Sequence, residues 1–154
     1  MNRAKTIILG IVGVLVIIQF IRPDRNYAGQ TSDQSMIRLY HTPDSIHQIL
    51  RQSRMNCHSN NTRYPWYANV QPLGWWLDYH IRKGKEELNL DEFAGYSDRR
   101  RISKLRSMKD QVGDGIMPLR SYRWIHREAR LSDAQKAVLT DWLNKTIDSL
   151  NQLE

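Results

Sequence analysis

The stretch Ser53-Arg54-Met55-Asn56-Cys57-His58-Ser59-Asn60 contains the chain's single cysteine, followed directly by a histidine. Cys-His is the second half of the C-x-x-C-H signature of haem attachment, in which two thiols bond to the haem vinyl groups and the histidine becomes an axial ligand of iron. The spacing has a geometric reason: residues three apart share one helical face, and the adjacent histidine is carried beneath the macrocycle. Arg54 occupies the first cysteine position. At most one thioether can therefore form, through Cys57.

The side chain of Arg54 cannot replace the missing thiol as a nucleophile. A guanidinium group stays protonated and has no lone pair to offer. We expect Arg54 to lie near the haem edge that bears the unreacted vinyl group or to turn to solvent, and snorkelling makes the solvent orientation easier. Without haem, Cys57 would be a small buried thiol beside a polar histidine. The Cys-His pair alone leaves both interpretations open.

Helix signals occur on both sides of this stretch. The first helix is predicted to begin at Thr42-Pro43-Asp44, where a cap residue precedes proline at the first helical position. It would carry Cys57 and His58 at or near its end. The next helix is predicted over residues 73–83, which place an apolar stripe on one face. Gly84 is expected to terminate that helix.

A loop is predicted between these two helices, over residues 60–72, because it contains two prolines and three asparagines. Tyr64, Trp66 and Tyr67 are unusual for a solvated loop. They either pack over a flat cofactor or cap the core of the domain, and the sequence does not decide between these roles.

Two further helices are predicted in the C-terminal half. One begins at the cap Ser97-Asp98 and is broken by Gly113-Asp114-Gly115, and the last follows the capping box Ser132-x-x-Gln135. No segment shows the alternation of a β-strand, and no internal repeat is present. The sequence predicts an all-α fold, a small cytochrome c-like helical domain with long loops.

The N-terminus predicts a membrane segment. Residues 6–21 carry no charge and are rich in Ile, Val and Leu, with Lys5 and Arg22 as flanking basic residues. The run would be about 24 Å long as a helix, slightly less than a hydrocarbon core of about 30 Å. No small-x-small cleavage site follows, so an uncleaved anchor is favoured over a cleaved signal peptide. The predicted organisation is a signal anchor over 1–25, a polar tether over 26–41 and a haem-binding domain over 42–154.

Composition narrows the function classes. The chain has 154 residues, a net charge of +7 and 40% hydrophobic residues, as expected for one modest globular domain with an appendage. Its basic residues are dispersed, and the densest run, Arg99-Arg100-Arg101, lies at the start of a predicted helix. A solvated helix face explains this run better than nucleic-acid binding does. A single cysteine excludes an intrachain disulfide framework.

The order of several motifs resembles the family of membrane-anchored haem-binding domains of bacterial envelopes. That family typically reads C-Y-D-C-H-S-N-x-T-R-W-P-W-Y, then P-x-S-W-W, then G-x-M-P-L, then I-H-P-E-A-R-L-S. The corresponding residues here are Cys57-His58-Ser59-Asn60, Thr62-Arg63-Tyr64-Pro65-Trp66-Tyr67, Pro72-Leu73-Gly74-Trp75-Trp76, Gly115-Ile116-Met117-Pro118-Leu119 and Ile125-His126-Arg127-Glu128-Ala129-Arg130-Leu131-Ser132. The departures are Arg54 for the first cysteine, Asn56 for aspartate, Tyr64 for tryptophan and Gly74 for serine. Only Arg54 affects the chemistry, because it puts double covalent attachment out of reach.

The resemblance implies haem as the cofactor, with Cys57 and His58 as attachment site and proximal ligand. Met117 is the favoured second iron ligand, since it lies on a glycine-containing loop that Pro118 stiffens. The alternative is a methionine that only fills the core. His80, on the apolar stripe of the second helix, is the next candidate. The remaining histidines are less suitable: His41, His47 and His126.

No catalytic constellation is visible. The sequence contains no Gly-rich phosphate loop and no multi-cysteine zinc spacing. With both axial positions filled, iron has no room for a substrate, so an electron carrier is favoured over an enzyme. The predicted protein lies in the bacterial inner membrane with its domain in the periplasm, where it would meet redox partner proteins. Two alternatives remain: a haem sensor or enzyme with an open iron site, and an interaction module that keeps the fold without haem.

Overall fold

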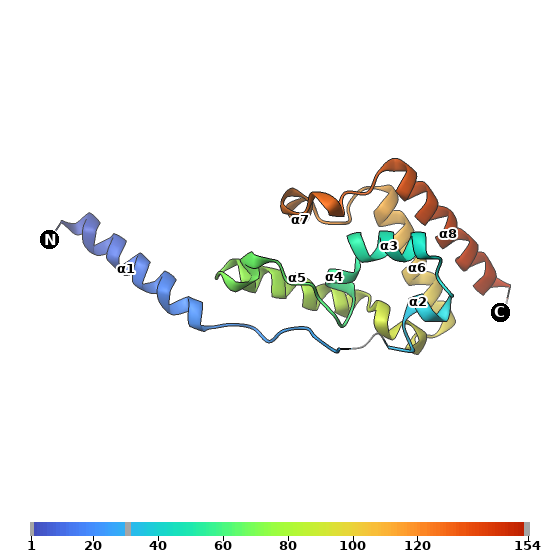
Figure 1. Cartoon of the computed structure of the whole chain (residues 1–154), viewed down its shortest axis with the longest axis horizontal. Helices are drawn as coiled ribbons and strands as arrows, with labels where there is room; N and C mark the ends of the chain where they lie inside the picture. Colours follow the sequence, from blue (N-terminus) through green and yellow to red (C-terminus); the bar gives the residue numbers. More distant parts are fainter. Residues whose placement is uncertain (1, 30–31, 153–154) are drawn as a thin grey trace.

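Apolar side chains at helical spacing build the main core of the domain. The computed structural model describes residues 2–29 and 32–152. Helix α6 (Asp98–Gly113) and helix α8 (Asp133–Asn151) pack along each other, and α3 (Asp44–Ser53) packs against α8 (Figure 1). Each of these helices buries a single stripe, as an amphipathic helix at the surface of a core does. The stripes of α6 and α8 are Ile102, Leu105, Met108 and Val112, and Leu139, Leu143, Ile147 and Leu150.

The remaining elements are helical too. In chain order they are α1 (Arg3–Ile17), α2 (Met36–Leu39), α4 (Met55–His58), α5 (Leu73–Glu87) and α7 (Arg120–Ile125), with short 3₁₀ helices η1 (Ile18–Phe20), η2 (Trp66–Asn69), η3 (Leu90–Gly95) and η4 (Arg127–Ala129). None of residues 2–29 and 32–152 forms a β-strand, so the predicted all-α fold is confirmed. The predicted capping box is also present, because Ser132 accepts from the Gln135 amide and Gln135 accepts from that of Ser132.

Helix α5 runs past the residue that was expected to end it. Gly84 lies inside α5, which continues to Glu87. A Cβ atom at position 84 would lie 2.6 Å from the carbonyl oxygen of Cys57. Glycine at this position therefore marks a close approach of α5 to α4 rather than a helix end.

The helix that carries Cys57 and His58 is broken at Arg54. Its φ of −131° and ψ of −44° separate α3 from α4, while its carbonyl oxygen accepts hydrogen bonds from the amides of Cys57 and His58 at 3.1 Å. The short helix α4 thus turns away from α3 and packs on α5. A second, smaller apolar cluster forms there from Tyr67, Ala68, Leu77 and Ile81, with Cys57, Tyr64 and Trp76 against it.

The segment predicted to tether the domain makes defined contacts with it. Asn26 donates to the Ser59 carbonyl oxygen and to Thr62 Oγ1, both at 2.9 Å. Its backbone amide donates to Tyr64 Oη at 2.8 Å. Tyr27 pairs with Asn61 in an isolated antiparallel bridge. The chain between the N-terminal helix and the domain is therefore held against the loop that follows His58.

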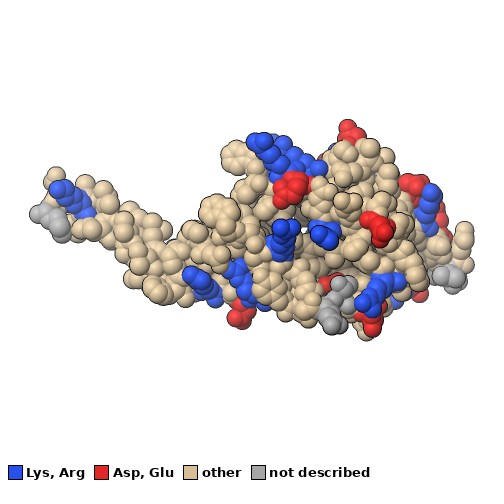
Figure 2. Space-filling view, viewed as in Figure 1, with Lys and Arg blue, Asp and Glu red and all other residues tan. Residues whose placement is uncertain are grey.

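Helix α1 stands clear of the domain core. None of its residues is buried, and with η1 it forms the single described helix, Arg3–Phe20, that is long and apolar enough to cross a membrane. In Figure 2, the projecting arm of the molecule has basic side chains at its two ends and none between them, whereas basic and acidic side chains are interspersed over the domain. This distribution is consistent with a signal sequence or a single membrane anchor.

Candidate functional site

An apolar cavity of about 340 Å³ lies between α4, α5, α6 and the loop before α7. Its size falls within the range of small-molecule pockets. Four of the residues considered as haem contacts line this one cavity: Cys57, His58, His80 and Met117. His47 and His126 line a different, more open hollow. His41 borders neither space.

His58 presents one free ring nitrogen to the cavity. It is buried, and its Nδ1 lies 3.0 Å from the backbone oxygen of Leu88, just beyond α5. A carbonyl oxygen can only accept, so Nδ1 carries the proton and Nε2 keeps its lone pair. Burial lowers the pKa of His58, which keeps the imidazole neutral. This is the state in which histidine binds a metal, with its ring oriented by a backbone acceptor.

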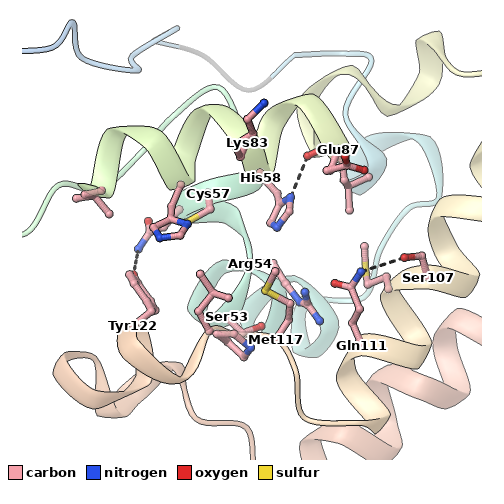
Figure 3. Close-up of a pocket in the computed structure, with 18 of the residues that line it drawn as sticks. Ser53, Arg54, Cys57, His58, Lys83, Glu87, Ser107, Gln111, Met117 and Tyr122 are labelled. Atoms are coloured by element: carbon pink, nitrogen blue, oxygen red, sulfur yellow. Dashed lines mark hydrogen bonds between the residues drawn. The ribbon is translucent and has the colours of Figure 1, made fainter. Parts of the chain in front are cut away.

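Met117 extends into the same space from the facing wall. Its loop is held to the end of α6, since the amides of Ile116 and Met117 donate to the Gln111 carbonyl oxygen at 3.1 and 3.2 Å. In Figure 3, the His58 ring and the Met117 side chain enter the space between α5 and this loop from opposite sides. The prediction that Met117 lies on a loop rather than in a helix is confirmed.

Cys57 borders the cavity as a protonated thiol. Burial raises its pKa to about 11, so the sulfur is uncharged at neutral pH. The side chain packs against the cluster that contains Leu77 and Trp76. A neutral thiol at the apolar end of a cavity can meet an apolar group of a ligand, such as a vinyl group.

His80 lies on α5 and also borders the cavity. Its ring stands edge-on to Trp76, with 4.6 Å between the ring centroids, and burial lowers its pKa. His80 therefore has both the location and the neutral form that an iron ligand needs. The geometry leaves it as the alternative to Met117.

Arg54 does not turn to solvent. Its side chain is 4% exposed and lines the cavity, and neither Nε nor Nη2 has a hydrogen-bond partner. Arg54 precedes the first residue of α4, and from there its side chain extends into the cavity. Burial lowers the pKa of Arg54 to about 10, and the group remains charged at neutral pH.

The loop aromatic Tyr67 belongs to a polar chain that sequence reasoning did not find. Tyr67 Oη lies 2.9 Å from His126 Nε2, and His126 Nδ1 lies 3.1 Å from a Glu128 carboxylate oxygen. Because the carboxylate only accepts, His126 donates to Glu128 and accepts from Tyr67. The ring of Tyr122 stacks on His126 at 4.2 Å. These hydrogen bonds tie the 60–72 loop to the end of α7.

Asn56 and Asn60 hold the residues around the Cys-His pair in place. Asn56 Nδ2 donates to Tyr122 Oη at 2.8 Å, and Asn56 Oδ1 accepts from the Arg63 amide at 3.2 Å. The Asn60 amide donates to Asp91 Oδ2 at 2.8 Å. The Asn60 side chain donates to Glu92 Oε1 at 2.9 Å, so both asparagines make structural contacts next to the Cys-His pair.

An all-α domain with a neutral imidazole, a thioether and a thiol around one apolar cavity has the features of a site for a flat metal macrocycle. The chain matches the model of the haem-binding domain family over residues 13–145, and it belongs to that family. No curated protein and no solved structure matches it. The residues present suit haem, because His58 offers a free nitrogen, Met117 a sulfur and Arg54 an unpaired buried cation in the same cavity.

Proposed function

We propose that this chain is a membrane-tethered, c-type-like haem protein that transfers electrons on the periplasmic side of the bacterial inner membrane. One observation carries the proposal: His58 and Met117 reach a single apolar cavity from facing walls, and Cys57 borders the same cavity. When bound, haem supplies an iron centre that gains and loses one electron. His58 and Met117 would hold the iron between them, which would leave no place on it for a substrate.

Cys57 is proposed to hold the haem by one thioether. Addition of its Sγ–H across a vinyl group would form one C–S bond and place the thiol hydrogen on the other vinyl carbon, so no oxidant would be required. The raised pKa keeps that hydrogen on sulfur until addition occurs. With the haem tethered to Cys57, His58 would be present at a high effective concentration near the iron, which would limit loss of the haem.

Helix α1 is proposed to remain as an uncleaved anchor, with residues 26–154 in the periplasm. Its exposed apolar surface and its basic flanks support this location. In spheroplasts of cells that express the full chain, added protease should degrade the domain, while the intact chain stays in the membrane fraction. A protected domain, or a shortened soluble form, would contradict the anchor.

The proposed function predicts a specific optical behaviour. The full chain, co-expressed with haem-attachment machinery and purified in detergent, should show the absorption bands of low-spin haem in both oxidation states. Carbon monoxide should leave the reduced spectrum unchanged, because both axial positions are filled. A shift with carbon monoxide would indicate an open iron site, as in a sensor or enzyme, and a chain without haem would indicate an interaction module.

The same preparation tests the single thioether. Haem should stay with the polypeptide in denaturing electrophoresis, and its pyridine haemochrome band should fall between those of free-vinyl and doubly linked haem. Haem that separates from the chain under denaturing conditions would show that Cys57 is unreacted.

A further inference from the structure

Arg54 is a buried cation without a counter-charge. Its side chain is 4% exposed, and Nε and Nη2 make no hydrogen bond. Among residues 2–29 and 32–152, no ion pair includes it. A buried charge that is neither paired nor hydrogen-bonded is costly. A well-packed fold therefore keeps an unpaired buried charge where a bound ligand can supply the counter-charge.

No carboxylate of the cavity wall is placed to do this. Glu87 is the acidic residue that lines the cavity, but its side chain is 80% exposed and lies 3.5 Å from Lys104. The cavity wall therefore supplies no counter-charge to Arg54, and the space that Arg54 borders is open to a ligand that carries one.

The cavity has a polar end and an apolar end. In Figure 3, the guanidinium of Arg54 points away from Cys57, toward Gln111. Lys104 and Ser107 of α6 line the cavity together with Gln111. At the other end, Cys57 packs against the apolar cluster of Tyr67, Ala68, Leu77 and Ile81. A ligand that fits both ends has one apolar edge and one anionic edge.

We propose that Arg54 binds a propionate carboxylate of the haem and that the α6 end of the cavity is its carboxylate subsite. The inference rests on the proposed function, since it assumes haem in this cavity. Haem has the required asymmetry, with vinyl groups on one edge and two propionates on another. A guanidinium can donate two parallel hydrogen bonds to one carboxylate, which a thiol cannot do. The chain thus replaces one covalent bond with an ionic contact.

Binding of haem and of its dimethyl ester, which lacks the carboxylates, tests the subsite. The full chain is prepared in detergent without attachment machinery and in a Cys57→Ser background, so that binding stays reversible. The ratio of the two affinities is measured by titration for the Arg54 protein and for Arg54→Met. Partition of the ester into detergent affects both proteins alike, so the change in the ratio is the informative quantity. Arg54→Met should lower the preference for free haem about 10- to 100-fold, and Arg54→Lys should lower it less.

Arg82→Met is the matched control, because Arg82 is an exposed arginine on α5 that pairs with Asp78. Arg82→Met should keep the full preference for haem over its dimethyl ester. The haem-free chains give a second readout: Arg54→Met should unfold at higher denaturant concentration than the Arg54 protein, since it removes an unpaired buried charge. An equal preference in Arg54→Met, Arg54→Lys and Arg54 proteins overturns the subsite. If the Arg54 protein binds neither porphyrin, the proposed function fails as well.

Discussion

At position 54 the chain carries a long cation where the attachment signature has a thiol. Both side chains would enter the same space, because the start of α4 fixes the backbone there. The thiol forms a bond that survives unfolding, whereas a guanidinium stabilises a ligand only while the cavity excludes water. In the proposed complex, retention of haem would depend on Cys57, His58 and the packing of the cavity together.

The substitution Arg54→Cys tests whether α4 already has the attachment geometry. The new thiol would lie three residues before Cys57 on the cavity wall, so it should bond to the second vinyl group. The pyridine haemochrome band of the co-expressed chain should then move to the doubly linked position. Arg54→Ser, which shortens the side chain without adding a thiol, should leave the band where it is. An unmoved band in Arg54→Cys would contradict the placement of Cys57 and His58.

A sulfur ligand on iron has its own signature. Ferric haem with Met117 bound should show a weak near-infrared charge-transfer band, and Met117→Ala should abolish it. The reduction potential should fall in this variant, because a thioether favours ferrous iron. His80→Ala is the matched comparison, since His80 lines the same cavity. If His80→Ala alters the spectrum and Met117→Ala does not, the second ligand is His80.

The contact between α4 and α5 is the element on which the site depends. His58 donates to Leu88, at the end of α5, and Cys57 lies against Gly84 in its last turn. The orientation of the histidine ring and the place of the thiol are therefore set by one helix-to-helix distance. A change in that distance would affect both residues at once.

Gly84→Ala should push these helices apart. The added methyl group would lie 2.6 Å from the Cys57 carbonyl oxygen, a backbone atom that cannot move freely. The free energy of unfolding of the domain, measured in detergent by urea denaturation, should fall by about 1–3 kcal/mol. Haem affinity should fall with it. At Gly113 no atom lies within 4 Å of an added Cβ. Gly113→Ala should therefore leave the free energy of unfolding unchanged. Equal stability of the two variants would contradict the tight contact.

Local signals predicted α3, α5, α6 and α8, because hydrophobic stripes and capping residues lie within one segment, whereas the short helices α2 and α7 were not predicted. The same signals misplaced the end of α5, since a glycine marks either a helix end or a close approach and only the position of Cys57 decides. The burial of Arg54 had no local signal. The Tyr67–His126–Glu128 chain joins two distant loops, so neither loop alone could indicate it.

On the scale of the whole molecule, the apolar helix and the domain are connected by a docked segment. Gln19 Oε1 accepts from the Gln71 amide at 2.9 Å, and Trp75 Nε1 donates to the Ile21 carbonyl oxygen at 2.8 Å. With the contacts of Asn26, these bonds attach the end of the N-terminal segment to the start of α5. An anchor held in this way would fix how the haem cavity faces the membrane.

Asn26 is the residue where this docking can be tested. Its side chain donates to Ser59 and Thr62 and accepts from Lys85 Nζ at 2.7 Å. Asn26→Ala removes all three bonds, so the segment should open more often and expose the peptide bond after Arg25. Trypsin should cut there several times faster in the full chain in detergent, with the released domain identified by its mass. Asn144→Ala, at an exposed site on α8, should not change the rate. Equal cleavage of both variants would mean that the Asn26 side chain does not hold the segment.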